Sequence, residues 1–298
     1  MLDLIIEPMQ YGFMQRALLV SALAATACGI VGTFVVLRGM AFLGDAIAHS
    51  SLTGMGVAFL FGANVFLGAL CWAVPASLVI AALSRRSGIR IDAIIGVMFA
   101  GGFAVGVIII NSLKSYAGDL LGILFGNVLG ASWLDVLSVG ILAVGVLGVV
   151  RAFHKELVFT TYDPAVAEAA GVPVRFLEYM LPMLVALTTV AAIKTVGNVM
   201  VMSLLVVPSV TGAMLAQRLS SIMAASVACA LLAVIVGLYC SYYGDLPTGP
   251  TIVVVSVGLL LLVAALSPRR GFLSAWLRPR SSAAMAFDEA PEAEPVRE

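Results

Sequence analysis

Long runs of hydrophobic residues, separated by short polar stretches, dominate the chain. A run of about 20 apolar residues is long enough for an α-helix to cross the hydrocarbon core of a bilayer. Length and flanking residues predict nine such helices. They cover residues 14–36, 40–62, 64–84, 92–112, 133–150, 177–196, 198–217, 221–242 and 249–267. Merging 40–62 with a neighbour, or treating one segment as re-entrant, would give eight.

A further apolar stretch, residues 119–131, is rich in glycine and too short to cross alone. It could be re-entrant or interfacial, because such backbone survives at membrane depth only when it is buried in protein or faces water.

Composition supports the same class. The chain is 62% hydrophobic and 11% charged, with a mean hydropathy of +1.12, whereas about a quarter of the residues of a soluble domain are charged. We therefore predict an all-α polytopic membrane protein with about eight or nine transmembrane helices. Residues 1–270 form the transmembrane domain, and residues 271–298 form an acidic cytoplasmic tail that is expected to be disordered.

The distribution of basic residues sets the predicted orientation. With nine spans and the N-terminus outside, thirteen of the sixteen Lys and Arg residues fall on the cytoplasmic side. The outside receives Arg16, Lys114 and Lys194. Since Lys and Arg are enriched in cytoplasmic loops, this bias favours a cytoplasmic C-terminus.

The largest polar interruption, residues 151–176, contains the signals of a short helix. Asp163 is a good N-cap, Pro164 suits the first helical position, and Gly171 ends the segment. A helix over 164–170 on the cytoplasmic face is either an ordinary connector or a docking element for a soluble partner.

The outer loop "YYGDLPTGPT", residues 242–251, is rich in turn-forming residues. Asp245, Pro247 and Gly249 predict a tight, fixed turn before the last span.

Several kinds of chemistry have no support in the sequence. There is no GxxxxGK[ST] phosphate loop, no HExxH and no GxSxG. The four cysteines form no CxxC pair and are expected to be small core residues. We predict that the chain is not an enzyme, binds no permanent cofactor and has no nucleic-acid partner.

One pair of residues does suggest chemistry. Asp45 and His49 lie inside an apolar segment at i,i+4 spacing, which places both on one helix face. Ionisable groups at membrane depth are costly and usually face a cavity or a partner. A carboxylate and an imidazole suit Mn(II), Fe(II) or Zn(II). The two groups could instead hydrogen-bond each other or cap a broken helix. The neighbouring Gly44 and the hydroxyl residues after His49 allow close helix packing or a local break.

Four blocks resemble, in order, the membrane permease of bacterial manganese, zinc and iron ABC importers. They are "VVLRGMAFLGDAIAHSSLTGMGVAF" (35–59), "FTTYDPAVAEAAGV" (159–172), "VGNVMVMSLLVVPSVTGAMLA" (196–216) and "YYGDLPTGPTIVVVS" (242–256). The resemblance covers roughly residues 10–267. Its third block contains Gly197 and Pro208.

The resemblance implies a transport complex in the bacterial plasma membrane. Two copies of the chain, or the chain and a close paralogue, pair with two cytoplasmic ATPase subunits, and an extracytoplasmic metal-binding protein delivers the ion. Asp45 and His49 then line the translocation site. Asp163, Pro164, Glu168 and Gly171 belong to the ATPase-coupling segment. Ala165 departs from the family, in which a second acidic residue is common at this place.

Two other functions remain open from the residues. One is an ABC permease for a metal chelate of the siderophore or cobalamin kind. The other is a proton-coupled secondary transporter in which Asp45 carries the proton.

Overall fold

The computed structural model describes residues 7–112, 126, 128–198 and 201–266, and throughout these ranges it contains helices and no strand. Nine apolar helices coincide one for one with the predicted segments. They are α2 (Gly12–Leu37), α3 (Leu43–Leu60), α4 (Val65–Arg86), α5 (Ile91–Asn111), α7 (Trp133–Ala152), α10 (Val174–Val196), α11 (Val201–Leu215), α12 (Leu219–Gly244) and α13 (Thr248–Leu266). The predicted all-α class is therefore confirmed.

Seven of these helices are long and apolar enough to cross a membrane, and α3 and α11 are not among them. α11 has 15 residues, so it is about 22 Å long, against a hydrocarbon core of about 30 Å. α3 has 18 residues and carries Asp45 and His49. Both helices therefore depend on packing against longer neighbours.

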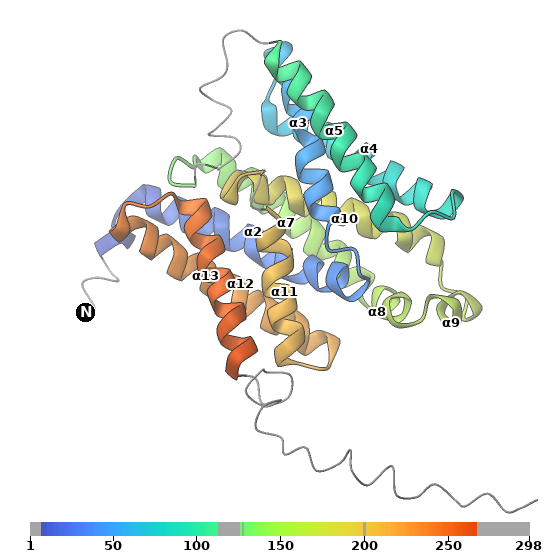
Figure 1. Cartoon of the computed structure of the whole chain (residues 1–298). Helices are drawn as coiled ribbons and strands as arrows, with labels where there is room; N and C mark the ends of the chain where they lie inside the picture. Colours follow the sequence, from blue (N-terminus) through green and yellow to red (C-terminus); the bar gives the residue numbers. More distant parts are fainter. Residues whose placement is uncertain (1–6, 113–125, 127, 199–200, 267–298) are drawn as a thin grey trace, which may run out of the picture.

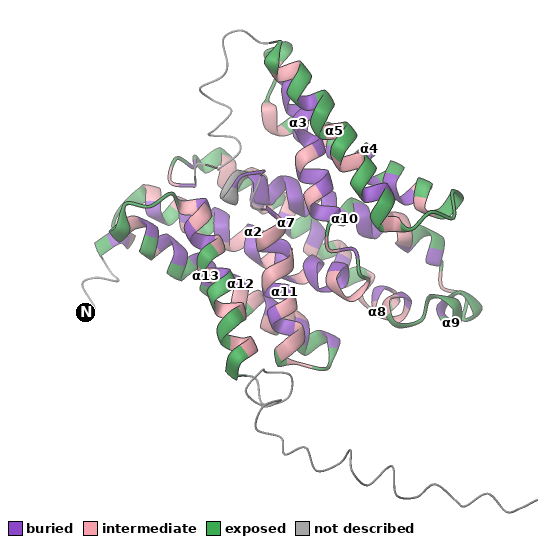
Figure 2. Ribbon diagram, viewed as in Figure 1, coloured by how far each residue is buried: buried purple, intermediate pink, exposed green. Residues whose placement is uncertain are grey.

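The helices form two packed groups. α2 contacts α7, α10, α11 and α12, while α3 lies against α4 and α5. α10 joins the groups because it contacts α2, α3 and α4; in Figure 1 the α3–α5 group leans away from the remainder. Buried residues face the helix contacts and exposed residues line the outer faces of α5 and α13 (Figure 2). Since those outer residues are mostly apolar, they suit contact with lipid.

Small residues let α3 pack closely on both neighbours. A Cβ added to Gly54 would overlap the backbone of Gly68 on α4, and one added to Gly102 on α5 would overlap Ser50. Thr53 also donates a hydrogen bond of 2.6 Å to the carbonyl oxygen of Gly102. Close backbone approach through small residues is the usual way in which helices associate inside membranes, and it fixes the position of α3.

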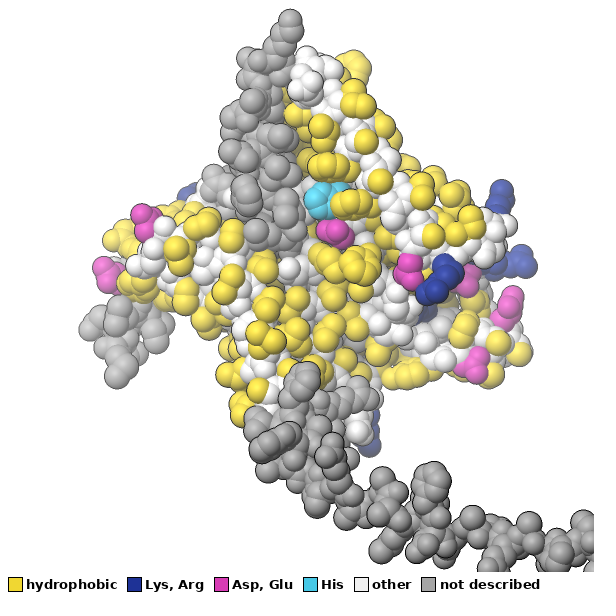
Figure 3. Space-filling view, viewed as in Figure 1, with side chains coloured by type: hydrophobic (Ala, Val, Ile, Leu, Met, Phe, Trp, Pro, Cys, Tyr) yellow, Lys and Arg dark blue, Asp and Glu magenta, His cyan; other side chains and the backbone are white. Residues whose placement is uncertain are grey.

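Two short helices interrupt the long ones between α7 and α10. The helix predicted over 164–170 is present as α9 (Pro164–Ala169). α8 (His154–Tyr162) precedes it and was not predicted, since its mixed sequence resembled a polar connector. Lys and Arg side chains gather near the end of α4, on the side of the protein toward which α8 and α9 project (Figure 3).

Some expectations fall outside the described residues. They concern the tail 271–298, Lys114, the Lys194 side chain and most of the apolar stretch 119–131.

We predict that Gly54→Ala destabilises the protein, because the added methyl group must push α4 away from α3. Overpacking of this kind costs about 1–3 kcal/mol. Gly101→Ala on α5 is the matched control, since a Cβ there meets nothing within 4 Å. Thermal unfolding of the purified protein should show a lower midpoint for Gly54→Ala and no loss for Gly101→Ala. An unchanged midpoint for Gly54→Ala would contradict the close packing.

Candidate metal site

Asp45 and His49 lie on the first two turns of α3. Asp45 occupies the first turn, where the free backbone N–H groups of the helix favour a negative charge. α3 begins at Leu43, after a turn in which Gly39 has a φ of +69°. The helix runs without a break to Leu60. The pair therefore lies on a continuous helix. The sequence allowed either close helix packing or a local break at this place, and the structure shows close packing.

The two side chains face the same space without forming a good hydrogen bond. The Nε2 atom of His49 is 3.5 Å from the Oδ1 atom of Asp45, which is beyond the usual range for an N–H···O bond. Their side chains are 14% and 23% exposed, respectively. Figure 3 shows a histidine and an acidic side chain together at α3, surrounded by hydrophobic side chains. Both groups thus keep lone pairs available for a shared cation.

The imidazole is held by two aromatic rings from α5. The centroid of the His49 ring lies 4.8 Å from that of Phe99 and 5.4 Å from that of Phe103, and both contacts are edge-on. The Nδ1 atom of His49 is buried and has no hydrogen-bond partner among the described residues. Phe99 and Phe103 restrain the ring, so the Nε2 atom remains directed toward Asp45. Sequence reasoning missed these phenylalanines, although their i,i+4 spacing marks one face of α5.

The hydroxyl groups after His49 are already used. Ser50 donates to the carbonyl of Ile47 at 3.1 Å, and Ser51 donates to that of Ala48 at 2.6 Å. Because both hydroxyl groups donate hydrogen bonds to backbone carbonyls of α3, they are not obvious additional metal ligands.

Four other side chains have buried polar atoms without partners within the described ranges: Arg16 and Ser21 on α2, Thr189 on α10, and Asn198, which follows the end of α10. Ser21, Thr189 and Asn198 were not singled out from the sequence. Thr189 lies beside α3. A Cβ atom built on Gly44 would be 3.7 Å from the Oγ1 atom of Thr189 and 2.7 Å from the side chain of Leu205 on α11. Buried polar atoms without partners are uncommon and often mark an absent water or ion.

The remaining residues of the family blocks lie at turns or helix contacts. Gly197 ends α10 with a φ of +83°, and Pro208 is buried within α11. Asp245 ends α12 in the left-handed region at a φ of +50°. Pro247 follows it, and Gly249 is buried in the first turn of α13. Ser241, which sequence reasoning missed, fixes this turn by donating to the carbonyl of Leu246 at 2.6 Å.

The segment that contains α9 projects from the bundle (Figure 1). Asp163 caps α9 by accepting a 2.9 Å hydrogen bond from the backbone of Val166. Pro164 occupies the first position, and Glu168 is exposed near the end. Gly171 turns the chain with a φ of +83°. Ala167 is the buried residue of this helix, so most of the surface of α9 is open to a partner.

Within the described residues, no group of three or more His, Cys, Asp or Glu side chains could hold a metal ion. Asp45 and His49 are therefore a candidate pair of ligands rather than a complete site. Two ligands can give a weak site, which suits an ion that must also leave.

Comparison with known proteins identifies related membrane proteins. The manganese transport system membrane protein MntC of Listeria innocua is 38% identical over 265 residues, which are 89% of this chain and 94% of that protein. MntB of Synechocystis, also described as a manganese transport system membrane protein, is 34% identical over 285 residues, covering 96% and 93%.

A solved structure is similar as well. The structure of PsaBC from Streptococcus pneumoniae in complex with Fab matches with a TM-score of 0.82 and 31% identity, over 93% of this chain and all of the other. The model of the ABC 3 transport family matches residues 10–267. These findings confirm the resemblance seen in the four sequence blocks: the chain belongs to the ABC 3 transport family.

Proposed function

We propose that the chain forms the membrane pathway of an ABC importer for a divalent transition-metal ion. Asp45 and His49 bind the ion in transit, and ATP is bound and hydrolysed on partner subunits. The observation that carries this proposal is the convergence of the Asp45 carboxylate and the His49 imidazole on one face of α3, at a separation of 3.5 Å, with little exposure.

A second copy of the chain would complete the site. One protomer supplies two strong ligands, and a symmetric pair places four around one ion, two carboxylates and two imidazoles. Homo-oligomers with two-fold symmetry present the same residues from both copies. Release toward the cytoplasm then requires only that the two pairs move apart, because each pair alone binds weakly.

Mn(II) is the first ion to test. The similar proteins from Listeria and Synechocystis are described as manganese transport proteins. The same oxygen and nitrogen ligands also accept Fe(II) and Zn(II), for which selectivity depends on geometry and availability. Competition for uptake between the three ions distinguishes them.

The exposed surface of α9 supports a soluble ATPase as the partner. Val166 of α9 is 52% exposed, and Tyr162, the last residue of the adjoining α8, is 62% exposed. Exposed apolar side chains that lie together indicate a contact surface. We propose that α9 docks on the ATPase, and that an extracytoplasmic binding protein delivers the ion to the opposite face.

The two alternatives fit less well. A proton-coupled carrier needs no ATPase, whereas the family to which the chain belongs is an ABC transport family. A chelate permease needs a wide route for a bulky ligand, and the close contact of Asp45 and His49 suits a bare ion better.

Replacing Asp45 by Asn or His49 by Ala should reduce Mn(II) uptake to background, because each change removes one of the two strong ligands of the protomer. The measurement is uptake of radioactive Mn(II) by cells expressing the whole transporter. Asp92→Asn is the matched control, since the Asp92 carboxylate is exposed and lies 3.7 Å from Arg90. Co-purification with the ATPase should be unchanged in all three variants. Normal uptake in both Asp45→Asn and His49→Ala would exclude this pair as the site.

Asp163→Ala should weaken binding of the ATPase, because loss of an N-cap costs about 1 kcal/mol and frays the helix. Asp163→Asn keeps a capping oxygen and should retain binding. Affinity of the purified permease for the ATPase, measured by surface plasmon resonance, tests this. Equal weakening by both variants would mean that the charge of Asp163, and not its cap, makes the contact.

A further inference from the structure

Arg38 lies between the helix that carries the metal pair and the helices that reach the ATPase. It is the residue after α2, and its backbone N–H bonds the carbonyl of Phe34 at 3.0 Å. The chain then turns at Gly39 and enters α3, whose first turn holds Asp45. Arg38 is thus seven positions before Asp45.

The turn after Arg38 is hydrogen-bonded at both ends. The N–H groups of Gly39 and Met40 bond to the carbonyls of Val36 and Val35 at 3.1 and 2.9 Å. The N–H group of Leu43 bonds to the carbonyl of Met40 at 3.0 Å. Because the connection has these bonds and Met40 is buried, a displacement of Arg38 should be passed to the start of α3 rather than absorbed by a loose loop.

The guanidinium group of Arg38 is attached to α8. Its Nη2 atom donates to the Oγ1 atom of Thr160 at 2.6 Å, and its Nε atom donates to that of Thr161 at 3.1 Å. Both hydroxyls donate onward to backbone carbonyls of α8: Thr160 to Glu156 at 2.9 Å and Thr161 to Leu157 at 2.6 Å. A hydroxyl has one donor and can accept as well, so each threonine joins the cation to the backbone of the helix.

The position of the two threonines connects this attachment to the coupling helix. Thr160 and Thr161 lie in the last turn of α8, which ends at Tyr162, and Asp163 then caps α9. The sequence of contacts therefore runs from α9 to α8, from α8 through two hydroxyls to Arg38, and from Arg38 through a bonded turn to Asp45.

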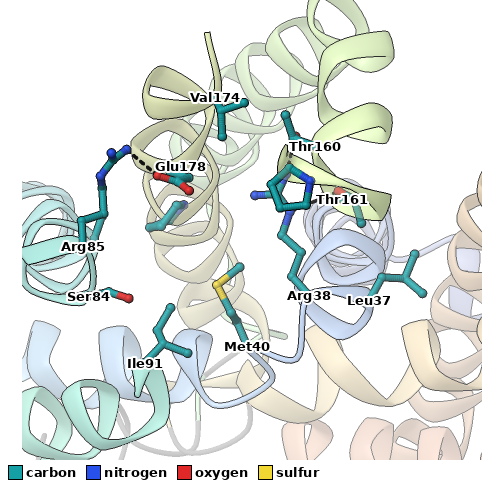
Figure 4. Close-up of a pocket in the computed structure, with 13 residues that line it drawn as sticks. Leu37, Arg38, Met40, Ser84, Arg85, Ile91, Thr160, Thr161, Val174 and Glu178 are labelled. Carbon is teal, nitrogen blue, oxygen red and sulfur yellow. Dashed lines mark hydrogen bonds and ion pairs between the residues drawn. The ribbon is translucent and has the colours of Figure 1, made fainter. Parts of the chain in front are cut away.

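A cavity of about 790 Å³ adjoins Arg38. Figure 4 shows Arg38 with Thr160 and Thr161 on one side of it, and Arg85 paired with Glu178 on the other. Burial lowers the pKa of Arg38, and the negative charge of Glu178 opposes this shift. An arginine stays charged in proteins, so a half-buried cation here needs its threonine acceptors. The cavity is also lined by Pro164, the first residue of α9, so it lies along the junction of α8 and α9.

We propose that Arg38 is a positioning residue that transmits the movement of α8 and α9 to Asp45 and His49. The inference rests on the proposed function and assigns to Arg38 the link between ATP hydrolysis and ion release. Arg38 is neither one of the proposed metal ligands nor part of the proposed docking surface. Its loss should therefore separate hydrolysis from transport, while the metal pair and the docking surface remain intact.

The test uses the whole transporter in proteoliposomes and measures the ratio of ATP hydrolysed to Mn(II) transported. Arg38→Met keeps an unbranched apolar stem but removes the donors, and it should raise this ratio at least about tenfold, within the usual range of coupling effects. Thr160→Val with Thr161→Val removes the acceptors and should have the same effect. Arg38→Lys retains a charged donor and should restore part of the coupling.

Combining the changes gives a sharper result. The combined variant carries Arg38→Met, Thr160→Val and Thr161→Val. If the three residues act through one contact, its ratio of ATP hydrolysed to Mn(II) transported should be no higher than that of Arg38→Met or of the double threonine variant. The reason is that effects within one network are not additive. Arg90→Met is the control, because the Arg90 side chain is 90% exposed on the same side of the protein.

The outcomes separate the two proposals. An unchanged ratio in Arg38→Met, or an equal fall in hydrolysis and transport, would overturn the role of Arg38. Additive effects in the combined variant would also overturn it. If the unaltered transporter shows no ATP-dependent uptake of Mn(II), Fe(II) or Zn(II), the proposed function itself is wrong.

Discussion

Polar groups inside a membrane must find partners within the protein, because lipid offers none. This requirement is met along α3 except at one place. The hydroxyls of Ser50, Ser51 and Thr53 are bonded to backbone carbonyls. Asp45 and His49 are instead left 3.5 Å apart, with the second nitrogen of the imidazole buried and unbonded among the described residues. Asp45 and His49 therefore mark the part of α3 whose polar groups are not arranged to stabilise the fold.

The surroundings of the pair combine tight packing with a route for movement. Gly54 and Gly102 bring α3 against α4 and α5, and two phenylalanines of α5 hold the imidazole. At the first turn of α3, Arg38 attaches the start of this helix to α8 beside an open cavity. One end of the short helix is therefore fixed by packing, whereas the other is joined to α8, which leads into the projecting helix α9.

Sequence patterns were sufficient wherever the signal is local. The nine apolar runs became nine helices because hydrophobic length alone determines such segments. The short helix α9 was predictable because Asp163 and Pro164 give an N-terminal signal that needs no tertiary contact. α8 was missed because its residues carry neither a long apolar run nor a clear cap. The packing of α3 was left undecided for a related reason: glycines and hydroxyls permit both a break and a close contact.

The sequence by itself determined the helical class, the i,i+4 pair of Asp45 and His49, and the family. Each of these depends on the order and spacing of residues along the chain. Tertiary structure alone decided that the pair faces one space without bonding, that Phe99 and Phe103 hold the imidazole, and that Arg38 reaches α8. The contacts of the two phenylalanines and of Arg38 join residues about 50 to 120 positions apart, and their directions are set by helix packing, which no local pattern records.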